Sequence, residues 1–335
     1  MKNLYQYLLA ITLLILVSIG QIKAQDIPLF SQKLTNSFIY NPAMAGLEHG
    51  SATLAHRSHF SNVSGAARDN FFSLHAPFVD HHIGVGINLF SEKVNFVNNI
   101  YASAAFAYHL DLGSPGTLSM GLSGEYNSLG FDQNKVIGDL DDPMIAERES
   151  RLDFSFGLNY QHPYFRVGIS TNRMASLFDM GKKAHLLSGY YSVYTAGLLP
   201  VRGGADLLEP TLSYRKLSEV TDIWNVGLYY TYDNLILAGL AYQKGDLLSL
   251  TAGVKVAQKL WVGYSYEMIN TTYKASLGST SEITLRYDFK ENNYRERLGR
   301  LRPKGKHNHS KINKQQLHKK QQKRTKRRLR NYNRK

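Results

Sequence analysis

The segment that ends at Phe289 alternates apolar and polar residues, and the same alternation recurs along the chain from about Ser51 onward. Successive side chains of a β-strand point to opposite sides, so each such segment has one apolar and one polar face. In the last segment the two faces consist of Ile283, Leu285, Tyr287 and Phe289 against Glu282, Thr284, Arg286 and Asp288. A soluble sandwich would bury the apolar face, whereas a transmembrane barrel would turn it to lipid and keep the polar face in its lumen.

The first residues of the chain predict export. Lys2 precedes an apolar run over residues 8–19, and the small residue Ala24 offers a cleavage site. This run is too short for a membrane-spanning helix and has the form of a secretory signal peptide. We therefore expect a cleaved signal peptide at residues 1–24, with an uncleaved membrane anchor as the alternative.

The composition agrees with an exported envelope protein. The chain has no cysteine, so neither disulfides nor thiolate chemistry can contribute. It has 22 tyrosines and 15 phenylalanines, and aromatic side chains form girdles where a barrel meets the two membrane interfaces. Beyond the first residues, no stretch approaches the roughly 20 consecutive apolar residues of a spanning helix.

Fourteen segments have the alternation and the length of barrel strands. About 9–11 residues suffice for a tilted strand to cross the hydrocarbon core of a membrane. The expected strands lie near residues 50–59, 68–77, 82–91, 97–109, 117–129, 151–161, 164–171, 185–196, 208–216, 222–232, 234–242, 247–256, 259–268 and 280–289. The pattern predicts an all-β fold, a transmembrane antiparallel β-barrel of about fourteen strands over residues 50–289.

The connection lengths favour a barrel over a two-sheet sandwich. With both ends of the barrel in the periplasm, every second connection should be a short turn. Residues 161–163, 232–234 and 257–259 are such turns, and the long loops 130–150 and 172–184 alternate with them. The connection 197–207 is longer than a periplasmic turn should be. Residues 25–49 are then a periplasmic N-terminal segment.

The distribution of charge divides the chain at about Phe289. Residues 290–335 hold 19 Lys or Arg against Glu291 and Glu296, a net charge of +17. The rest of the chain has 21 basic and 24 acidic residues, a net charge of −3. Because this tail lacks apolar periodicity and carries runs of like charge, it cannot bury a core. We expect a disordered or conditionally helical basic tail in the periplasm.

Five stretches of the chain carry a family resemblance: residues 25–32 (QDIPLFSQ), 40–46 (YNPAMAG), 72–77 (FSLHAP), 209–215 (EPTLSYR) and 278–289 (GSTSEITLRYDF). They resemble the PorP/SprF family of outer-membrane proteins from Bacteroidetes. Their order and spacing together carry the resemblance over about residues 25–289.

This resemblance implies an outer-membrane component of the type IX secretion system. Family members are needed for export or surface anchoring of large secreted adhesins, including those of gliding motility. They bind partners and are not enzymes, so the implied partners are an adhesin cargo, other secretion components and outer-membrane lipid. Typical members end close to the final aromatic residue, and the basic tail of this chain is a departure from that pattern.

The residues Tyr40, Asn41, Pro42 and Gly46 stand just before the first expected strand. Asn-Pro starts a turn and Gly46 permits unusual backbone torsions, so a simple turn is one interpretation. A periplasmic plug or docking segment at the barrel mouth, able to bind a partner, is the other. The two interpretations are compatible.

The final aromatic residues Tyr287 and Phe289 are candidate assembly residues. They could belong to the edge strand of a soluble sheet. With an export signal and many preceding strands, we interpret them as an outer-membrane assembly signal on the lipid-facing side of the last strand.

The acidic loop that contains Asp139, Asp141 and Asp142 is a candidate partner-binding surface. Calcium prefers such oxygen ligands, but the regular spacing of a calcium-binding loop is missing and a solvated loop is favoured. The histidine pairs lack the spacing of metal ligands within a strand, and no nucleophile motif or phosphate-binding glycine loop is present. We expect no metal, no cofactor and no enzymatic activity.

The tail contains one dense basic run, which consists of Lys319, Lys320, Lys323, Arg324, Lys326, Arg327 and Arg328. In the cytosol such a run would suggest nucleic acid, but export places it elsewhere. Anionic lipid headgroups, an anionic periplasmic polymer or an acidic face of a secretion component are the expected partners, with a merely solvated tail as the alternative.

A second function for the whole chain is transport. A barrel of this size can carry small or hydrophobic solutes as an outer-membrane channel, and Glu282, Arg286 and Asp288 would then line its pore.

Overall fold

The computed structural model of the chain describes residues 30, 34, 37–47, 49–78, 82–112, 116–131, 149–178, 189–217, 222–269 and 274–290. All of them belong to one compact unit, Met1–Tyr294. The predicted signal peptide, Asp139, Asp141 and Asp142 of the acidic loop, and the basic tail beyond residue 290 lie outside these residues. Within the described ranges, no helix is long and apolar enough to cross a membrane.

Strands dominate this part of the chain. The helical elements are the 3₁₀ turns η1 (Ser37–Ile39), η2 (Pro42–Met44) and η4 (Arg202–Gly204) and the short helices α3 (Met174–Leu177) and α4 (Lys274–Leu277). The strands are β1 (Ser51–Ser58), β2 (Arg68–Phe78), β3 (Ile83–Val94), β4 (Val97–Asp111), β5 (Thr117–Phe131), β6 (Glu149–His162), β7 (Phe165–Asn172), β8 (Tyr190–Gly197), β9 (Leu199–Val201), β10 (Asp206–Leu217), β11 (Ile223–Tyr232), β12 (Ile236–Gln243), β13 (Leu247–Ala257), β14 (Leu260–Ile269) and β15 (Ser279–Asp288).

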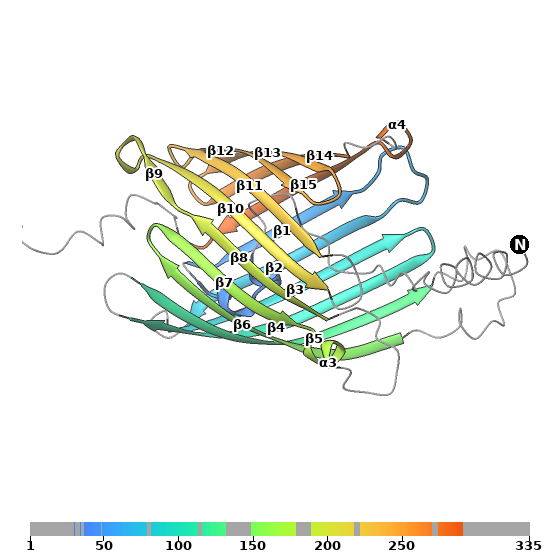
Figure 1. The fold of residues 1–335 in the computed structure, drawn as a ribbon, viewed down its shortest axis with the longest axis horizontal. Helices are drawn as coiled ribbons and strands as arrows, with labels where there is room; N and C mark the ends of the chain where they lie inside the picture. Colours follow the sequence, from blue (N-terminus) through green and yellow to red (C-terminus); the bar gives the residue numbers. More distant parts are fainter. Residues whose placement is uncertain are drawn as a thin grey trace, which may run out of the picture. The chain divides into compact units, whose positions relative to one another are not determined.

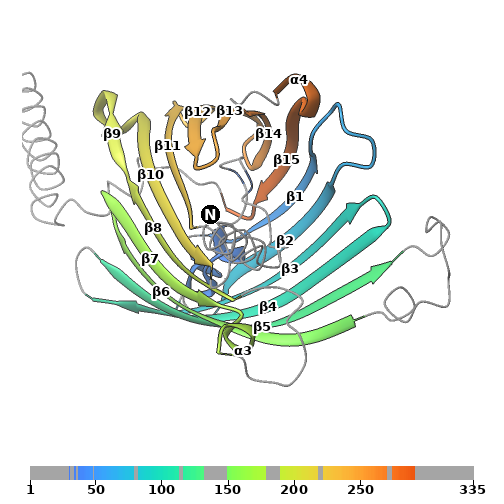
Figure 2. The same cartoon turned by 45° about the vertical axis from the view of Figure 1, so that its right-hand side comes forward.

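Fourteen of these strands close into one antiparallel barrel (Figures 1 and 2). Each pairs with its neighbours along the chain, and β8 pairs directly with β10. The ring closes where β1 pairs with β15, in a register that joins Ser51 to Asp288 and Ser58 to Ser281. A closed ring has no free strand edge and satisfies the backbone of every strand, as a hydrocarbon environment requires. The predicted barrel of about fourteen strands is confirmed.

The strand β9 is additional to the barrel and was not predicted. It pairs with the first residues of β10 and is followed by the 3₁₀ turn η4. The carboxylate of Asp206 accepts hydrogen bonds from the backbone N–H of Asp233 at 2.9 Å and from the Arg202 guanidinium at 3.2 Å. The connection 197–207, which is too long for a simple turn, is therefore a folded unit against the barrel rim.

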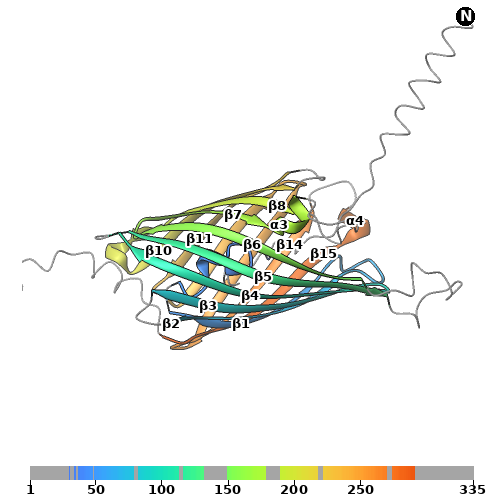
Figure 3. The same cartoon turned by 90° about the horizontal axis from the view of Figure 1, so that it is seen from below.

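The two ends of the barrel differ in their connections. The first and last strands begin and end at the same rim, which we call the turn end; its connections span residues 79–82, 112–116, 163–164, 198–205, 233–235 and 258–259. At the opposite rim, the loop end, the connections span residues 59–67, 95–96, 132–148, 173–189, 218–222, 244–246 and 270–278. Figure 3 shows the strands running between the two rims. The longest connections all lie at the loop end.

The two faces of the barrel wall have opposite character. In β3, Val85, Ile87 and Leu89 are more than 40% exposed on the outer face, whereas Asn88 and Phe90 are buried on the inner face. The same alternation places hydroxyl and charged side chains of the other strands inside. An apolar exterior around a polar interior is the arrangement of an outer-membrane barrel.

Aromatic side chains mark both limits of the apolar exterior. Those near the loop end include Tyr126, Tyr191, Tyr214, Trp224 and Tyr242, and those near the turn end include Phe78, Tyr108, Phe165, Tyr232 and Tyr287. Rings with an apolar body and a polar edge are favoured where hydrocarbon meets headgroups. These two girdles delimit the membrane-spanning belt.

Candidate functional site: a chain segment inside the barrel

A segment that precedes β1 lies within the ring of strands (Figure 2). We call residues 37–47 the inner segment. Its side chains Phe38, Ile39 and Met44 are buried, and its turn η2 contacts β4, β5 and β6. The lumen of the barrel therefore holds the protein's own chain.

Asn41 fixes the turn η2 and attaches it to the wall. Its side-chain oxygen accepts a hydrogen bond from the backbone N–H of Ala43 at 3.0 Å, which caps the turn. Its side-chain nitrogen donates to the carbonyl oxygens of Leu158 at 3.0 Å and Ile169 at 3.2 Å. Pro42 follows at the first position of the turn, where its fixed torsion fits and no N–H is needed.

The wall beneath η2 is built from glycines. A β-carbon added at Gly84, Gly121 or Gly157 would lie 1.9, 2.4 or 2.0 Å from an atom of the inner segment. At Gly168 it would lie 2.9 Å from the side-chain nitrogen of Asn41. We call these four residues the glycine wall; only the absence of side chains lets the segment reach the backbone of the strands.

Two buried histidines hold the end of the inner segment. The backbone N–H of Gly46 donates to Nδ1 of His75 at 3.0 Å, and Nε2 of the same ring lies 3.0 Å from Oγ of Ser51. Nε2 of His109 lies 3.0 Å from the carbonyl oxygen of Ala45. Gly46 has a φ of 68°, in the left-handed region that favours glycine. The chain can therefore turn from the lumen into β1.

Tyr40 joins the inner segment to an aromatic cluster and to a cation. Its hydroxyl oxygen accepts a hydrogen bond from the backbone N–H of Phe30 at 2.9 Å, and Phe30 packs 4.9 Å from the ring of Phe71. The Arg215 guanidinium lies 4.3 Å from the centre of the Tyr40 ring. Tyr40 also lines a cavity inside the barrel. Burial raises the pKa of Tyr40 to about 12, against the opposing effect of Arg215.

Residues ahead of the inner segment reach another part of the wall. Leu34 packs with Tyr229, Leu237, Ala241 and Trp261 of β11, β12 and β14. Its carbonyl oxygen accepts a hydrogen bond from Arg286 at 3.4 Å. The chain ahead of β1 thus contacts strands on both sides of the lumen.

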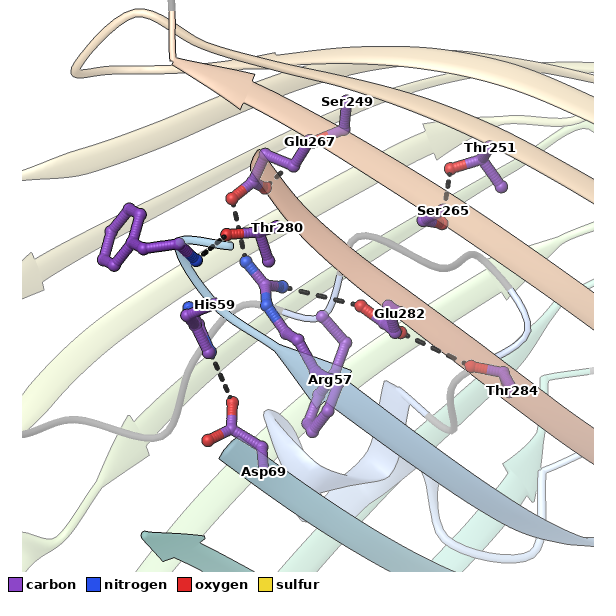
Figure 4. Close-up of polar contacts among 12 residues, drawn as sticks. Arg57, His59, Asp69, Ser249, Thr251, Ser265, Glu267, Thr280, Glu282 and Thr284 are labelled. Carbon is purple, nitrogen blue, oxygen red and sulfur yellow. Dashed lines mark hydrogen bonds and ion pairs between the residues drawn. The ribbon is translucent and has the colours of Figure 1, made fainter. Parts of the chain in front are cut away.

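The wall around β1, β14 and β15 is charged. Arg57 lies between two buried carboxylates, 2.9 Å from Glu267 and 3.5 Å from Glu282, as Figure 4 shows. Hydroxyl groups bind the same carboxylates: Ser249 donates to Glu267 and Thr284 to Glu282. We call Arg57, Glu267, Glu282 and Arg286 the charged wall. Its groups bridge the seam at which the barrel closes.

A further polar cluster anchors the start of the loop 173–189. The carboxylate of Asp153 in β6 accepts hydrogen bonds from the backbone N–H groups of Ala175 and Ser176, at 2.8 and 3.1 Å. The hydroxyl of Ser176 adds a third bond at 2.6 Å. This carboxylate fixes the short helix α3 at the loop end.

A cavity of about 120 Å³ remains beside the inner segment. Tyr40, Asn41 and Met44 line it on one side, and Arg215 and Gln243 line it on the other. Arg215 and Gln243 lie within the last residues of β10 and β12 at the loop end. Guanidinium, amide and ring groups converge there, which are the groups that orient a bound chain or small molecule.

The predicted candidate residues fall into three groups. Tyr40, Asn41, Pro42 and Gly46 lie together in the inner segment, where the chain forms the predicted turn and also packs inside the barrel. Their partner-binding role stays a prediction. The acidic-loop residues and the basic run lie outside the part of the chain that the structure describes.

The third group consists of Tyr287 and Phe289. Both side chains are exposed on the outer face, with ring centres 6.2 Å apart. The backbone N–H of Phe289 donates to the carbonyl oxygen of Gly50 at 3.2 Å, which ties the end of the last strand to the start of the first. Their role as an assembly signal stays a prediction.

The glycine wall and the ion pairs of Arg57 were not identified from the sequence. Glycines at inward positions of long strands were the available signal for the first, because a glycine inside a strand often marks a close backbone approach. The charged wall offered only an inward polar face, without pairing information. In the described ranges, no group of three or more His, Asp or Glu is placed to hold a metal ion.

Comparison with known protein families finds a match over most of the chain. A family model described as "Type IX secretion system membrane protein PorP/SprF" matches residues 22–287. No curated protein matches the chain.

Three solved structures illustrate what the chain is similar to. Omp33 of Acinetobacter baumannii has 8% identity and a TM-score of 0.46, over 73% of this chain and 100% of that one. A FadL homologue of Pseudomonas aeruginosa has 11% identity and a TM-score of 0.46, over 77% and 95% of the two chains. The CymD monoaromatic hydrocarbon channel has 13% identity and a TM-score of 0.45, over 75% and 92%.

Proposed function

We propose, from the premise that this chain belongs to the PorP/SprF family of type IX secretion system membrane proteins, that it binds a secreted protein at the loop end of its barrel. In this role it promotes export of that protein or its anchoring at the cell surface. The chain is an outer-membrane β-barrel, and the role that we propose is non-enzymatic.

The observation that carries this proposal is the occupied lumen. The inner segment is attached to the barrel wall by the two carbonyl bonds of Asn41 and by the bonds of His75 and His109. Porins keep a polar water-filled lumen, whereas the lumen here holds part of the protein's own chain, which argues against a porin-like open pore. A barrel filled in this way suits a receptor whose rim and loops bind a partner.

The loop end is the face that we propose for the secreted partner. Short turns face the periplasm and longer connections face outward in bacterial barrels, so the loop end would lie at the cell surface. The loops 130–150 and 172–184 would contact the C-terminal region of a secreted adhesin of the gliding type. The cavity lined by Arg215 and Gln243 would accept a segment of that partner.

The turn end and the basic tail are proposed to contact other components in the periplasm. With Phe289 at the turn end, the tail would begin there. Its net charge of +17 suits an anionic lipid surface, an anionic polymer or an acidic face of the secretion machinery. Removal of residues 291–335 should weaken recovery of secretion components at low salt; unchanged recovery would contradict the tether.

Affinity purification from native outer membranes in mild detergent tests the proposal. The wild-type chain should retain a large secreted protein and other secretion components, identified by mass. Gln243→Trp places a large ring in the cavity, and Tyr242→Trp is the matched control because Tyr242 faces lipid on the same strand. We expect loss of the secreted protein with Gln243→Trp and retention with Tyr242→Trp.

The competing function is an outer-membrane channel for small or hydrophobic solutes. The inward positions of Glu282, Arg286 and Asp288 agree with either function, since these groups face the lumen in both. Recovery of the barrel alone, together with solute flux through the pure protein, would favour the channel over a secretion partner.

A further inference from the structure

A patch of polar and basic side chains lies on the outer face of β1, β2 and β3 near the loop end. Arg68 and Lys93 are direct cross-strand neighbours, and both are exposed. One step closer to the belt, His56 and Asn70 are also cross-strand neighbours, with Nδ1 of His56 2.9 Å from Oδ1 of Asn70. The two cations give this part of the outer face a local positive charge that attracts anions.

An apolar groove of about 530 Å³ begins directly below this patch. His56, Asn70 and Ser91 line its polar end, nearest to Arg68 and Lys93. Outer-face aliphatic and aromatic residues line most of the remainder: Leu54, Phe72, Leu89, Ile100, Ile283 and Leu285. The buried residues Ala55, Phe71, Phe90 and Tyr101 complete the lining. The groove spans β15, β1, β2, β3 and β4 and lies within the membrane-spanning belt.

We infer that this patch and groove bind a phosphorylated acyl lipid of the outer leaflet. Arg68 and Lys93 contact the phosphate, His56 and Asn70 contact polar groups of the headgroup, and the groove receives an acyl chain. The leaflet follows from the orientation proposed above, with the loop end at the cell surface. The binding chemistry itself does not depend on a secretion partner.

The positions of the two cations and of the groove fit a phosphorylated acyl lipid. The guanidinium of Arg68 can bind two phosphate oxygens at once, and Lys93 adds a second cation from the facing strand. The cations sit just outside the apolar belt, at the depth of headgroups, and the groove continues toward the hydrocarbon. A phosphate joined to an acyl chain matches both parts.

Native mass spectrometry of the purified full chain tests this site. The probes are diphosphoryl lipid A and the same lipid with its phosphates removed, each titrated into the protein in detergent. The variant Arg68→Gln with Lys93→Gln removes both cations from an exposed surface and leaves the barrel interior intact. The matched control is Lys216→Gln, which removes an exposed outer-face cation of β10 near the loop end, away from the groove.

Wild type and Lys216→Gln should bind the diphosphoryl lipid more tightly than the dephosphorylated one. The double variant should lose roughly tenfold in affinity for the diphosphoryl lipid, because two charge-assisted contacts are removed. Ser91→Trp, which fills the groove, should weaken both lipids while the protein stays folded by its heat-dependent electrophoretic mobility. Equal binding of the two lipids, or equal binding by all variants, would overturn the inference. So would a protein that co-purifies with wild type and is absent from Ser91→Trp.

Discussion

The two sides of the lumen use opposite chemistry to hold the same chain. The glycine wall has no side chains beneath η2, and the inner segment binds the strand backbone itself through Asn41. The charged wall is filled by long side chains that bind each other, and it contacts the chain ahead of β1 through Arg286 and Leu34. The glycine wall therefore fixes the inner segment, whereas the charged wall mainly stabilises the closed barrel.

The largest expected effect is on the charged wall. Arg57→Ala leaves the carboxylates of Glu267 and Glu282 buried without their shared cation, and should lower the free energy of unfolding by about 3–5 kcal/mol. Urea unfolding of the barrel in lipid vesicles measures this change. Adding Glu267→Gln and Glu282→Gln to Arg57→Ala should restore most of the loss. No recovery in the triple variant would mean that packing of the Arg57 side chain, and not charge, stabilises the seam.

The next largest effect is expected from a substitution in the glycine wall. Gly157→Val places side-chain atoms where Asn41 lies and should displace the inner segment at a cost of about 1–3 kcal/mol. Because the chain has no cysteine, Met44→Cys can report this displacement through its rate of maleimide labelling, which should rise about tenfold or more. Gly124→Val is the control, since a β-carbon there meets nothing within 4 Å. Equal labelling rates in both variants would contradict the packing of the inner segment against the glycine wall.

Substitutions of Asn41 separate its cap of the turn from its hydrogen bonds to the wall. Asn41→Ala removes the cap and both carbonyl bonds, and should cost about 1–2 kcal/mol. Asn41→Asp keeps the cap on Ala43 but cannot donate to Leu158 or Ile169, and it sets a carboxylate against their carbonyl oxygens. In the same assay, Met44→Cys should be labelled at least as fast with Asn41→Asp as with Asn41→Ala. If Asn41→Asp behaves as wild type, the cap alone holds the turn.

The smallest effect concerns Tyr40 and is seen most clearly in its pH dependence. Tyr40→Phe removes the acceptor for the Phe30 N–H and should cost about 0.5–1.5 kcal/mol near neutral pH. The folded pKa of about 12 lies above the ordinary value of 10, so the unfolded chain loses its proton first. The contribution of Tyr40 is complete below pH 10 and is lost as the pH rises toward 12. A parallel decline of wild type and Tyr40→Phe over this range would contradict the burial of the hydroxyl.

The sequence was sufficient for the barrel and insufficient for its interior. Period-two alternation in segments such as β15 reports which face meets lipid, because a strand has only two faces. The strand β9 has three residues, too few to show any period. Asn41 finds its partners 117 and 128 residues away in the chain, at Leu158 and Ile169, and local patterns carry no information about such pairs.

The motif at Tyr40–Asn41–Pro42 has a local structure that the sequence predicts and long-range contacts that it does not. Its turn was predictable, because Asn and Pro act on their own backbone. Its packing against the barrel wall depends on Gly121 and Gly157, which come together only when β5 and β6 pair. The inward polar residues of β14 and β15 were likewise predictable as a face, but the choice of Arg57 as their partner depends on closure of the ring.

Ionic conductance of the pure protein in a planar bilayer tests most directly whether the inner segment blocks the lumen. We expect no steady conductance for wild type and open-channel conductance for Gly157→Val, whose inner segment is displaced. Steady conductance through the wild-type barrel, unchanged by Gly157→Val, would contradict this expectation and would identify the chain as a channel.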